Sequence, residues 1–364
     1  MTTPTHPFKD PGPRGTVRQT VLVALSGGVD SAAAAALLLQ GGSAAEAAYM
    51  ITCDRGLDGR AEVQRIADRL GMVLHVLDLR PDFQAMLRYV LDEYRQGRTP
   101  NPCARCNRQI KFGRLWDLAR ARGLAMLATG HYAQVLATQT GPGLFEAEHR
   151  DKDQSYVLSM IDRAMLSRVV LPMGRLSKAE ARRMAKELGL ALEHRPESQE
   201  ICFIPNDDYA GTLEQLCPDL VRPGLIVDSS GRVLGLHQGI HRFTIGQRRG
   251  LGVAMGRPWY VVRLDASTNT VVLGPRDEVL HKGLIASGAN WLVDPPCAAF
   301  RAKVKIRYHD QGRPAHVLPS GDAVRVQFDE PAPAVTPGQL AVFYSLAPHP
   351  AQVLGGAWID ASCD

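Results

Sequence analysis

The residues best suited to chemistry form a short turn, Ser26-Gly27-Gly28-Val29-Asp30-Ser31, between an apolar run and an alanine- and leucine-rich run. Two residues without a Cβ atom let backbone amides approach an anion, and the N-terminus of the following helix adds about half a positive charge. The hydroxyls of Ser26 and Ser31 add hydrogen-bond donors, and the Asp30 carboxylate suits Mg²⁺. The turn therefore predicts a phosphate-binding loop.

This loop differs from the G-x-x-x-x-G-K-[ST] loop, in which a lysine reaches the terminal phosphates. Here Ser31 follows Asp30, and no lysine is near in the sequence. The turn instead resembles the S-G-G-x-D-S signature of the ATP pyrophosphatases, which adenylate an oxygen and release pyrophosphate. The alternative is a plain glycine turn between a strand and a buried helix. The order of strand, turn and helix favours the phosphate loop.

Three cysteines form the second candidate group. Cys103 and Cys106 are separated by two residues, and Cys202 lies in a stretch without clear periodicity. A C-x-x-C pair is typical of a redox pair, half of a metal site or chance spacing. A structural zinc takes four ligands, and the chain has no second C-x-x-C, so zinc is not predicted. Basic side chains beside the pair would lower a thiol pKa below about 8.5 and favour the thiolate. These are Arg105, Arg108 and Lys111.

The length and composition of the chain limit the class of protein. A chain of 364 residues exceeds what one core usually holds, so we expect two or three domains. The net charge of +5 is compatible with a nucleic-acid surface but does not identify one. Residues 1–18 contain four prolines and no apolar run, which predicts a disordered leader. The absence of an apolar run of about 20 residues, together with seven cysteines and no export signal, predicts a cytoplasmic protein with no membrane partner.

Alternating apolar and amphipathic segments surround the phosphate loop. They predict strands at 47–52, 72–77 and 125–129 and helices at 60–70, 83–95 and 114–122. Such alternation is typical of a parallel sheet covered by helices, with ligands at the carboxyl ends of the strands. Gly130 follows the last of these strands and should line the nucleotide pocket.

The second half of the chain has a different pattern. Ser177, Glu180 and Gly189 predict a helix that begins with a capping box and ends at a glycine. Glycine, valine and turn residues then dominate, and alternating runs such as 301–307 and 323–328 predict an antiparallel β-barrel. The predicted division is a leader (1–18), an α/β catalytic domain (19–205), a central β-rich domain (206–280) and a C-terminal β-barrel (281–364).

Taken together, the phosphate loop and the cysteines resemble the tRNA-specific 2-thiouridylase family over nearly the whole chain. The resemblance rests on the stretches 24–31, 97–112, 128–132, 152–156, 250–252 and 336–339. It implies an adenine nucleotide α-hydrolase-like (PP-loop) fold and a sulfurtransferase that uses ATP and Mg. Its substrate would be the wobble uridine of Lys, Glu and Gln tRNAs, which becomes 2-thiouridine. The sulfur would come from a partner protein, either a cysteine desulfurase or a relay protein.

The resemblance also implies roles for the cysteines. Cys106 would be the nucleophile and Cys202 the persulfide carrier, and a Cys106–Cys202 disulfide would form if the sulfur is released as hydrosulfide. Some family members have aspartate where this chain has Cys103. All three thiols would alternatively hold an iron–sulfur cluster whose open iron binds sulfide.

Further site residues are implied by the same resemblance. The ATP-binding residues would be Ala24, Leu25, Ser26, Gly27, Gly28, Val29, Asp30, Ser31, Met50 and Gly130. The residues that contact the tRNA or its target base would be Asn101, Pro102, Cys103, His131, Lys152, Asp153, Gln154, Arg307, Tyr308 and Gln339. Structural alternatives remain for three of these groups: a core methionine at Met50, a buried structural histidine at His131, and a solvated charged turn at 152–154.

Two rival functions share some of these features. Another ATP pyrophosphatase, such as a tRNA 2-thiocytidine enzyme or an amidotransferase synthetase, would have the phosphate loop without the stretches around Cys106 and Cys202. An RNA-binding protein with a vestigial nucleotide site would not need an intact loop, and all its polar residues are present here.

Overall fold

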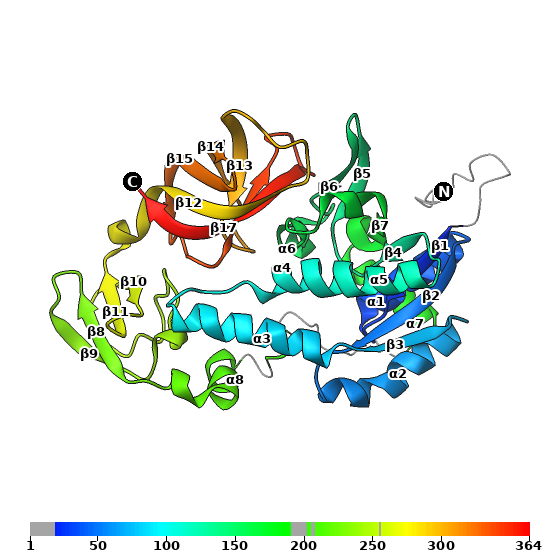
Figure 1. Ribbon diagram of the computed structural model, residues 1–364, viewed down its shortest axis with the longest axis horizontal. Helices are drawn as coiled ribbons and strands as arrows, with labels where there is room; N and C mark the ends of the chain where they lie inside the picture. Colours follow the sequence, from blue (N-terminus) through cyan, green and yellow to red (C-terminus); the bar gives the residue numbers. More distant parts are fainter. Residues whose placement is uncertain (1–18, 191–201, 205–207, 255) are drawn as a thin grey trace. The chain divides into compact units, whose positions relative to one another are not determined.

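The structure is a computed structural model, and it describes residues 19–190, 202–204, 208–254 and 256–364 (Figure 1). The predicted leader and residues 191–201, which precede Cys202, lie outside the described residues. The chain divides into two compact units. The first comprises Met1–Phe83, Asn107–Ser155 and Asp162–Ser198, and the second comprises Gln84–Cys106, Tyr156–Ile161 and Gln199–Asp364.

The first unit is built on a parallel sheet with the strand order β3-β2-β1-β4-β7. These strands are β1 (Thr20–Ala24), β2 (Ala44–Ile51), β3 (Leu74–Asp78), β4 (Met126–Ala128) and β7 (Val169–Val170). The chain adds β2 and β3 on one side of β1 and β4 on the other. The strand order therefore reverses at β1, and ligands of such sheets bind at the carboxyl ends of the strands beside this point.

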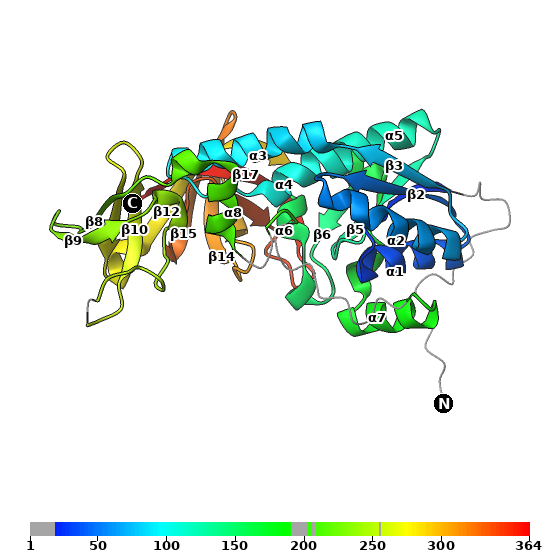
Figure 2. The same cartoon turned by 90° about the horizontal axis from the view of Figure 1, so that it is seen from below.

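Helices cover both faces of this sheet. Figures 1 and 2 show α1 (Val29–Gln40), α2 (Arg55–Arg69) and α7 (Lys178–Glu187) on one face and α5 (Leu115–Ala121) on the other. The five consecutive alanines of α1, residues 32–36, are buried, and their small side chains let the helix lie close to the sheet and to α7. The capping box predicted at Ser177 and Glu180 is present at the start of α7.

The three predicted helices differ from the structure in their bounds, and the three predicted strands differ by one to three residues at their ends. The helices predicted at 60–70 and 83–95 begin earlier, at Arg55 and Arg80. The helix predicted at 114–122 is the end of a longer helical run formed by α4 (Pro102–Cys106), the π-helix η1 (Asn107–Arg114) and α5. A π-helix has a wider turn than an α-helix, so it breaks the 3.6-residue apolar period on which the prediction depended.

Helix α3 spans Arg80–Arg95. Several shorter elements complete the first half of the chain. They are β5 (Gln134–Thr138), β6 (Gly141–Phe145), η2 (Arg150–Lys152), α6 (Ser155–Leu158), η3 (Arg163–Ser167) and η4 (Pro172–Arg175). Strands β5 and β6 form an antiparallel hairpin.

The second unit contains the central domain and the barrel. The central domain has α8 (Tyr209–Leu216), η6 (Pro218–Leu220), η7 (Ile240–Arg242) and a sheet of the order β10-β11-β8-β9. Its strands are β8 (Gly224–Asp228), β9 (Val233–His237), β10 (Tyr260–Asp265) and β11 (Thr270–Gly274), and η8 (Arg276–Val279) leads to the barrel. The buried side chains of this sheet form a core of their own around Trp259, Val261 and Leu273.

The C-terminal domain is a closed antiparallel barrel, as predicted. Its strands are β12 (Leu280–Trp291), β13 (Phe300–Lys305), β14 (Arg313–Ser320), β15 (Ala323–Pro333), β16 (Leu340–Tyr344) and β17 (Gln352–Cys363). The order β12-β15-β14-β13-β16-β17 is closed by pairing of β12 with β17. Valines alternate inward on β15, at Val324 and Val326, and pack with Phe343 in the barrel core. In the described part of the chain, no helix is both long and apolar enough to cross a membrane.

Candidate active site

The phosphate loop follows β1 at the point where the strand order of the sheet reverses. Ser31 Oγ donates to the Gly28 carbonyl at 3.0 Å and accepts from the Ser26 backbone amide at 3.1 Å. The hydroxyls of Ser26 and Ser31 are also 3.1 Å apart. These bonds fix the turn, and α1 begins at Val29 directly behind it. The loop thus presents backbone amides at a helix N-terminus, which is an arrangement that binds phosphate.

Two glycines are required by the geometry of this site. Gly27 has a φ of +80°, in the left-handed region that favours glycine. Gly130, which follows β4, lies against the first turn of α1, and a Cβ atom there would lie 2.9 Å from the Ser31 backbone nitrogen. The structure therefore brings Gly130 against the phosphate loop.

Four other predicted nucleotide-binding residues are at least partly covered by the fold. The side chains of Leu25 and Val29 are buried in the core, so only their backbone groups are left for a nucleotide. Met50 is half-buried near the carboxyl end of β2, next to β1. Ala24, at the end of β1, is also half-buried.

A lysine distant in sequence completes the loop. Lys178 Nζ lies 2.7 Å from both carboxylate oxygens of Asp30, and the Tyr132 hydroxyl donates to Asp30 Oδ1 at 2.7 Å. Lys178 is the first residue of α7, where the helix dipole disfavours a cation. The ion pair with Asp30 offsets that cost. Neither Lys178 nor Tyr132 is predicted as a site residue from the sequence, although a lysine directly after an N-cap serine is a usable signal.

His131 is buried and lies between two polar groups. Its Nδ1 is 2.7 Å from Thr129 Oγ1, and its Nε2 is 3.2 Å from Lys111 Nζ. An ammonium group can only donate, so Nε2 accepts and the proton of the neutral ring is on Nδ1. Burial, with a smaller contribution from Lys111, holds the pKa of His131 well below its usual value. His131 is therefore a neutral, buried ring in this structure.

The segment at 152–154 is anchored to the residues after β4. The Gln154 side chain accepts from the Tyr132 amide at 3.0 Å, and the Gln154 amide donates to the Tyr132 carbonyl at 2.7 Å. Asp153 accepts from the amides of Ala147 and Ser155. Lys152 is half-exposed at the end of η2. Asp153 and Gln154 thus have structural contacts of their own, and the half-exposed Lys152 precedes them.

The first two cysteines lie on a short helix with a defined start. Asn101 Oδ1 accepts from the Ala104 amide at 3.2 Å, as an N-cap does, and Pro102 occupies the first helical position, which favours proline. Cys103 is exposed and Cys106 is half-buried. The Arg105 guanidinium lies 4.0 Å from the ring centroid of Tyr89, so it packs on α3.

Cys202 is exposed and precedes Phe203, which packs against a buried cluster that includes Tyr94. Tyr89 and Tyr209 border the same cluster. Burial raises the pKa of Tyr209 to about 12, and the nearby Cys103 adds to the rise. The cluster thus has contacts both with the segment of Cys202 and with the surroundings of the cysteine helix, inside one unit. All seven cysteines are thiols in this structure.

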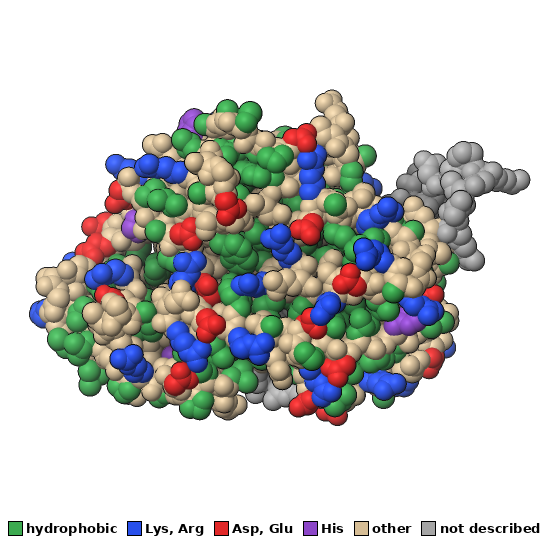
Figure 3. Space-filling model, viewed as in Figure 1, with side chains coloured by type: hydrophobic (Ala, Val, Ile, Leu, Met, Phe, Trp, Pro, Cys, Tyr) green, Lys and Arg blue, Asp and Glu red, His purple; other side chains and the backbone are tan. Residues whose placement is uncertain are grey.

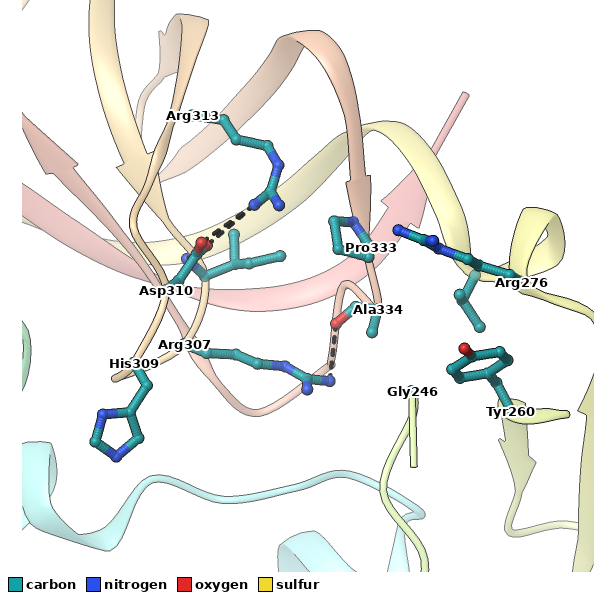
Figure 4. Close-up of a pocket in the computed structure, with 11 residues that line it drawn as sticks. Gly246, Tyr260, Arg276, Arg307, His309, Asp310, Arg313, Pro333 and Ala334 are labelled. Atoms are coloured by element: carbon teal, nitrogen blue, oxygen red, sulfur yellow. Dashed lines mark hydrogen bonds and ion pairs between the residues drawn. The ribbon is translucent and has the colours of Figure 1, made fainter. Parts of the chain in front are cut away.

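The barrel residues singled out from the sequence differ in exposure. Tyr308 is exposed and lies edge-on to the rings of Tyr156 and His309. Arg307 is half-buried, and Figure 4 shows its guanidinium beside Ala334, at a cavity of about 310 Å³ shared by the central domain and the barrel. On the face drawn in Figure 3, Lys and Arg side chains are interspersed with acidic ones, so no single basic patch marks an RNA surface there.

The donor groups of the site differ in their fit to metals. The Asp30 carboxylate, half-exposed beside the phosphate loop, is a hard oxygen ligand of the kind Mg²⁺ takes together with nucleotide phosphates. Among the described residues, which include all seven cysteines, no three His, Cys, Asp or Glu side chains are grouped to hold a metal ion. In this structure, Cys103, Cys106 and Cys202 are thus not grouped in a three-thiol site.

We expect Lys178→Met to lower ATP turnover by about 10²- to 10³-fold, because removal of one preorganised charged donor from an active site has effects of this order. The folded state should be retained, since α7 keeps its capping box. Pyrophosphate release measures the effect. Lys186→Met, on the exposed side of the same helix, is the matched control and should be unchanged. Equal turnover in the two variants would contradict a role for Lys178.

Comparison with known families covers nearly the whole chain. Residues 19–206 match the tRNA methyl transferase HUP domain, residues 212–275 the tRNA methyl transferase PRC-barrel domain, and residues 281–359 the aminomethyltransferase beta-barrel domain. The chain is 44% identical over 348 residues to the tRNA-specific 2-thiouridylase of Syntrophotalea carbinolica, covering 93% of this chain and 98% of that protein. It is 43% identical over 361 residues to the protein of the same name from Carboxydothermus hydrogenoformans, covering 94% and 98%.

Proposed function

Because the chain belongs to the tRNA-specific 2-thiouridylase family, we propose that it converts the wobble uridine of Lys, Glu and Gln tRNAs to 2-thiouridine with ATP. The observation that carries this proposal is the composite phosphate loop. Loop amides, the start of α1, Gly130, Asp30 and Lys178 lie together at the strand-order reversal of the sheet. Two of the matched domains carry the name tRNA methyl transferase, but this is the name of a domain family. The phosphate loop indicates an enzyme that uses a nucleotide.

The loop is suited to the first step, in which the uridine O2 attacks the α-phosphorus of ATP. The bond between the α-phosphorus and the bridging oxygen breaks, and pyrophosphate leaves with the electron pair. Loop amides and Lys178 would stabilise the negative charge that develops on pyrophosphate, and Asp30 would hold Mg²⁺. When ATP binds, the Lys178 ammonium group would leave the Asp30 carboxylate and contact phosphate oxygens instead. C2 of the base now has AMP as a leaving group.

The second step delivers sulfur. A donor protein would load Cys202 as a persulfide. The Cys106 thiolate would attack the Cys202 Sγ, so that the bond to the outer sulfur breaks and hydrosulfide leaves. Hydrosulfide attacks C2, AMP leaves, and the Cys106–Cys202 disulfide is later reduced by an external thiol. Alternatively, the outer persulfide sulfur attacks C2 directly and AMP leaves; the Cys106 thiolate would then attack Cys202 Sγ, so that the S–S bond breaks and the outer sulfur stays on C2 while the Cys106–Cys202 disulfide forms. Exposure of Cys202 supports loading by a protein donor, since a persulfide must be transferred between accessible sulfurs.

The tRNA would be held by Lys152 near the phosphate loop and by Tyr308 on the barrel. Both side chains are at least partly exposed. The target base would meet Asn101, Pro102 and Cys103. Asn101 and Pro102 are buried and shape the helix, whereas Cys103 is exposed.

A pyrophosphate-release assay with two tRNAs tests the function. Pyrophosphate should form with a tRNA that has a wobble uridine. When a sulfur source is added, that uridine should become 2-thiouridine. A tRNA with cytidine at the wobble position, otherwise identical, should support neither reaction. Turnover with the cytidine tRNA would favour the 2-thiocytidine enzyme, and RNA binding without any pyrophosphate would favour the RNA-binding rival.

A further inference from the structure

A barrel segment contacts the backbone that leads into the cysteine helix. We name residues 336–340 the barrel clamp. Gln339 Nε2 donates to the carbonyls of Thr99 and Pro100 at 3.1 and 3.0 Å, and the Thr99 amide donates to the Pro337 carbonyl at 2.9 Å. Thr99 and Pro100 immediately precede Asn101, the N-cap of α4. Three hydrogen bonds therefore join the clamp to the start of the cysteine helix.

Close packing and a buried tyrosine tighten this junction. A Cβ atom at Gly338 would lie 2.7 Å from the Thr99 carbonyl oxygen, so only glycine lets the two backbones approach this far. The Tyr156 hydroxyl donates to the Leu340 carbonyl at 3.0 Å and accepts from the Leu340 amide at 3.2 Å. It also interacts with the Asn101 side chain. The clamp thus reaches the residue that caps α4.

Arg307 fixes the other end of the clamp. Its Nη2 donates to Thr336 Oγ1 at 3.0 Å, to the Ala334 carbonyl at 3.2 Å and to the Ile245 carbonyl at 2.5 Å (Figure 4 shows the Ala334 bond). Ile245 belongs to the central domain. Burial lowers the pKa of Arg307 from its ordinary value. These contacts tie the central domain, the barrel clamp and the cysteine helix into one continuous network inside the second unit.

We propose that Gln339 is a positioning residue for Cys106. An amide nitrogen has two hydrogens, and here two carbonyl groups, which can only accept, take both. The Gln339 donors therefore hold the cysteine helix. This inference goes beyond the family resemblance, which implies only that Gln339 contacts tRNA. It rests on the proposed role of Cys106 in sulfur transfer, because a shift of the α4 start would move Cys106 relative to its sulfur and base partners.

Two variants and a control separate positioning from RNA contact. Gln339→Met keeps the length of the side chain but has no donor, and Gln339→Glu replaces the donor by an acceptor. Gln327→Glu, on an exposed position of β15, is the control for added charge. For both Gln339 variants, the single-turnover rate of 2-thiouridine formation should fall about 10- to 100-fold, as expected for a displaced reacting group. The tRNA Kd should stay within about twofold, because no phosphate contact is lost.

A second readout does not depend on catalysis. The rate at which iodoacetamide alkylates Cys106 in the protein alone, followed by peptide mass spectrometry, should change in both Gln339 variants and stay constant in Gln327→Glu. Unchanged alkylation, whether tRNA affinity falls or not, would overturn the inference. If the protein without substitutions makes no 2-thiouridine but the alkylation rates of the variants still differ from its own, the proposed function fails and the positioning of Cys106 stands. If Gln339→Glu does not fold, Gln339→Met gives the same decision.

Discussion

Cys202→Ser is expected to abolish 2-thiouridine formation completely while pyrophosphate release persists with wobble-uridine tRNA. A serine hydroxyl cannot carry a persulfide, so no sulfur reaches the base. Adenylation takes place at the phosphate loop and needs no sulfur. Mass spectrometry of tRNA nucleosides measures the first reaction, and a coupled phosphate assay measures the second. Cys106→Ser should give the same pair of results if sulfur is released as hydrosulfide.

Two further cysteine variants complete this test. Cys297 is an exposed cysteine of the same unit, and Cys297→Ser should leave both reactions unchanged. Cys103→Ser should keep substantial thiolation, because a persulfide relay uses only Cys106 and Cys202. An inactive Cys103→Ser protein, combined with stoichiometric iron in the anaerobically purified enzyme, would contradict the relay and support the three-thiol cluster. Thiolation that survives Cys202→Ser would remove Cys202 as the carrier.

Asp30→Asn should have a large effect on the other half of the reaction, the adenylation of the base. The amide keeps the shape of the side chain but loses the charge that would hold Mg²⁺ and that orders Lys178. We expect ATP turnover to fall by about 10²- to 10³-fold, the usual cost of removing a principal electrostatic group from an active site. The melting temperature should change little, because the Asp30 carboxylate lies at a partly exposed loop.

The control for this variant is Asp54→Asn. Asp54 precedes α2, is mostly exposed and pairs with Arg80, so it shares the charge of Asp30 but not its place on the phosphate loop. Its substitution should leave pyrophosphate release intact. Turnover of Asp30→Asn near that of Asp54→Asn would exclude the phosphate loop as the site of adenylation.

Local signals in the sequence account for much of the fold. The apolar run, the glycine turn and the alanine-rich run predict the strand β1, the loop Ser26–Ser31 and the helix α1. Each of these elements depends on residues that are close together in the sequence. The capping box at Ser177 is local in the same sense and is confirmed. The antiparallel barrel could be predicted because strands such as β15 alternate apolar and polar residues along their length, and the structure confirms it.

Long-range contacts account for what the sequence analysis missed. Lys178 meets Asp30 across 148 residues, and Gln339 meets Thr99 across 240. No periodicity or spacing encodes such a pair. The helical start of the cysteine stretch did have a local signal, an asparagine before a proline, but the π-helix after Cys106 hid the apolar period. The family resemblance implied that Gln339 contacts tRNA, but it did not indicate that Gln339 contacts the protein's own backbone.

The central claim is that the base oxygen of uridine becomes bonded to the α-phosphorus of ATP before sulfur enters. The most direct measurement uses tRNA with ¹⁸O at the C2 oxygen of the wobble uridine, followed by mass spectrometry of the AMP that the reaction releases. The account predicts that one ¹⁸O atom appears in AMP for each 2-thiouridine formed. AMP without the label, alongside normal 2-thiouridine formation, would contradict it.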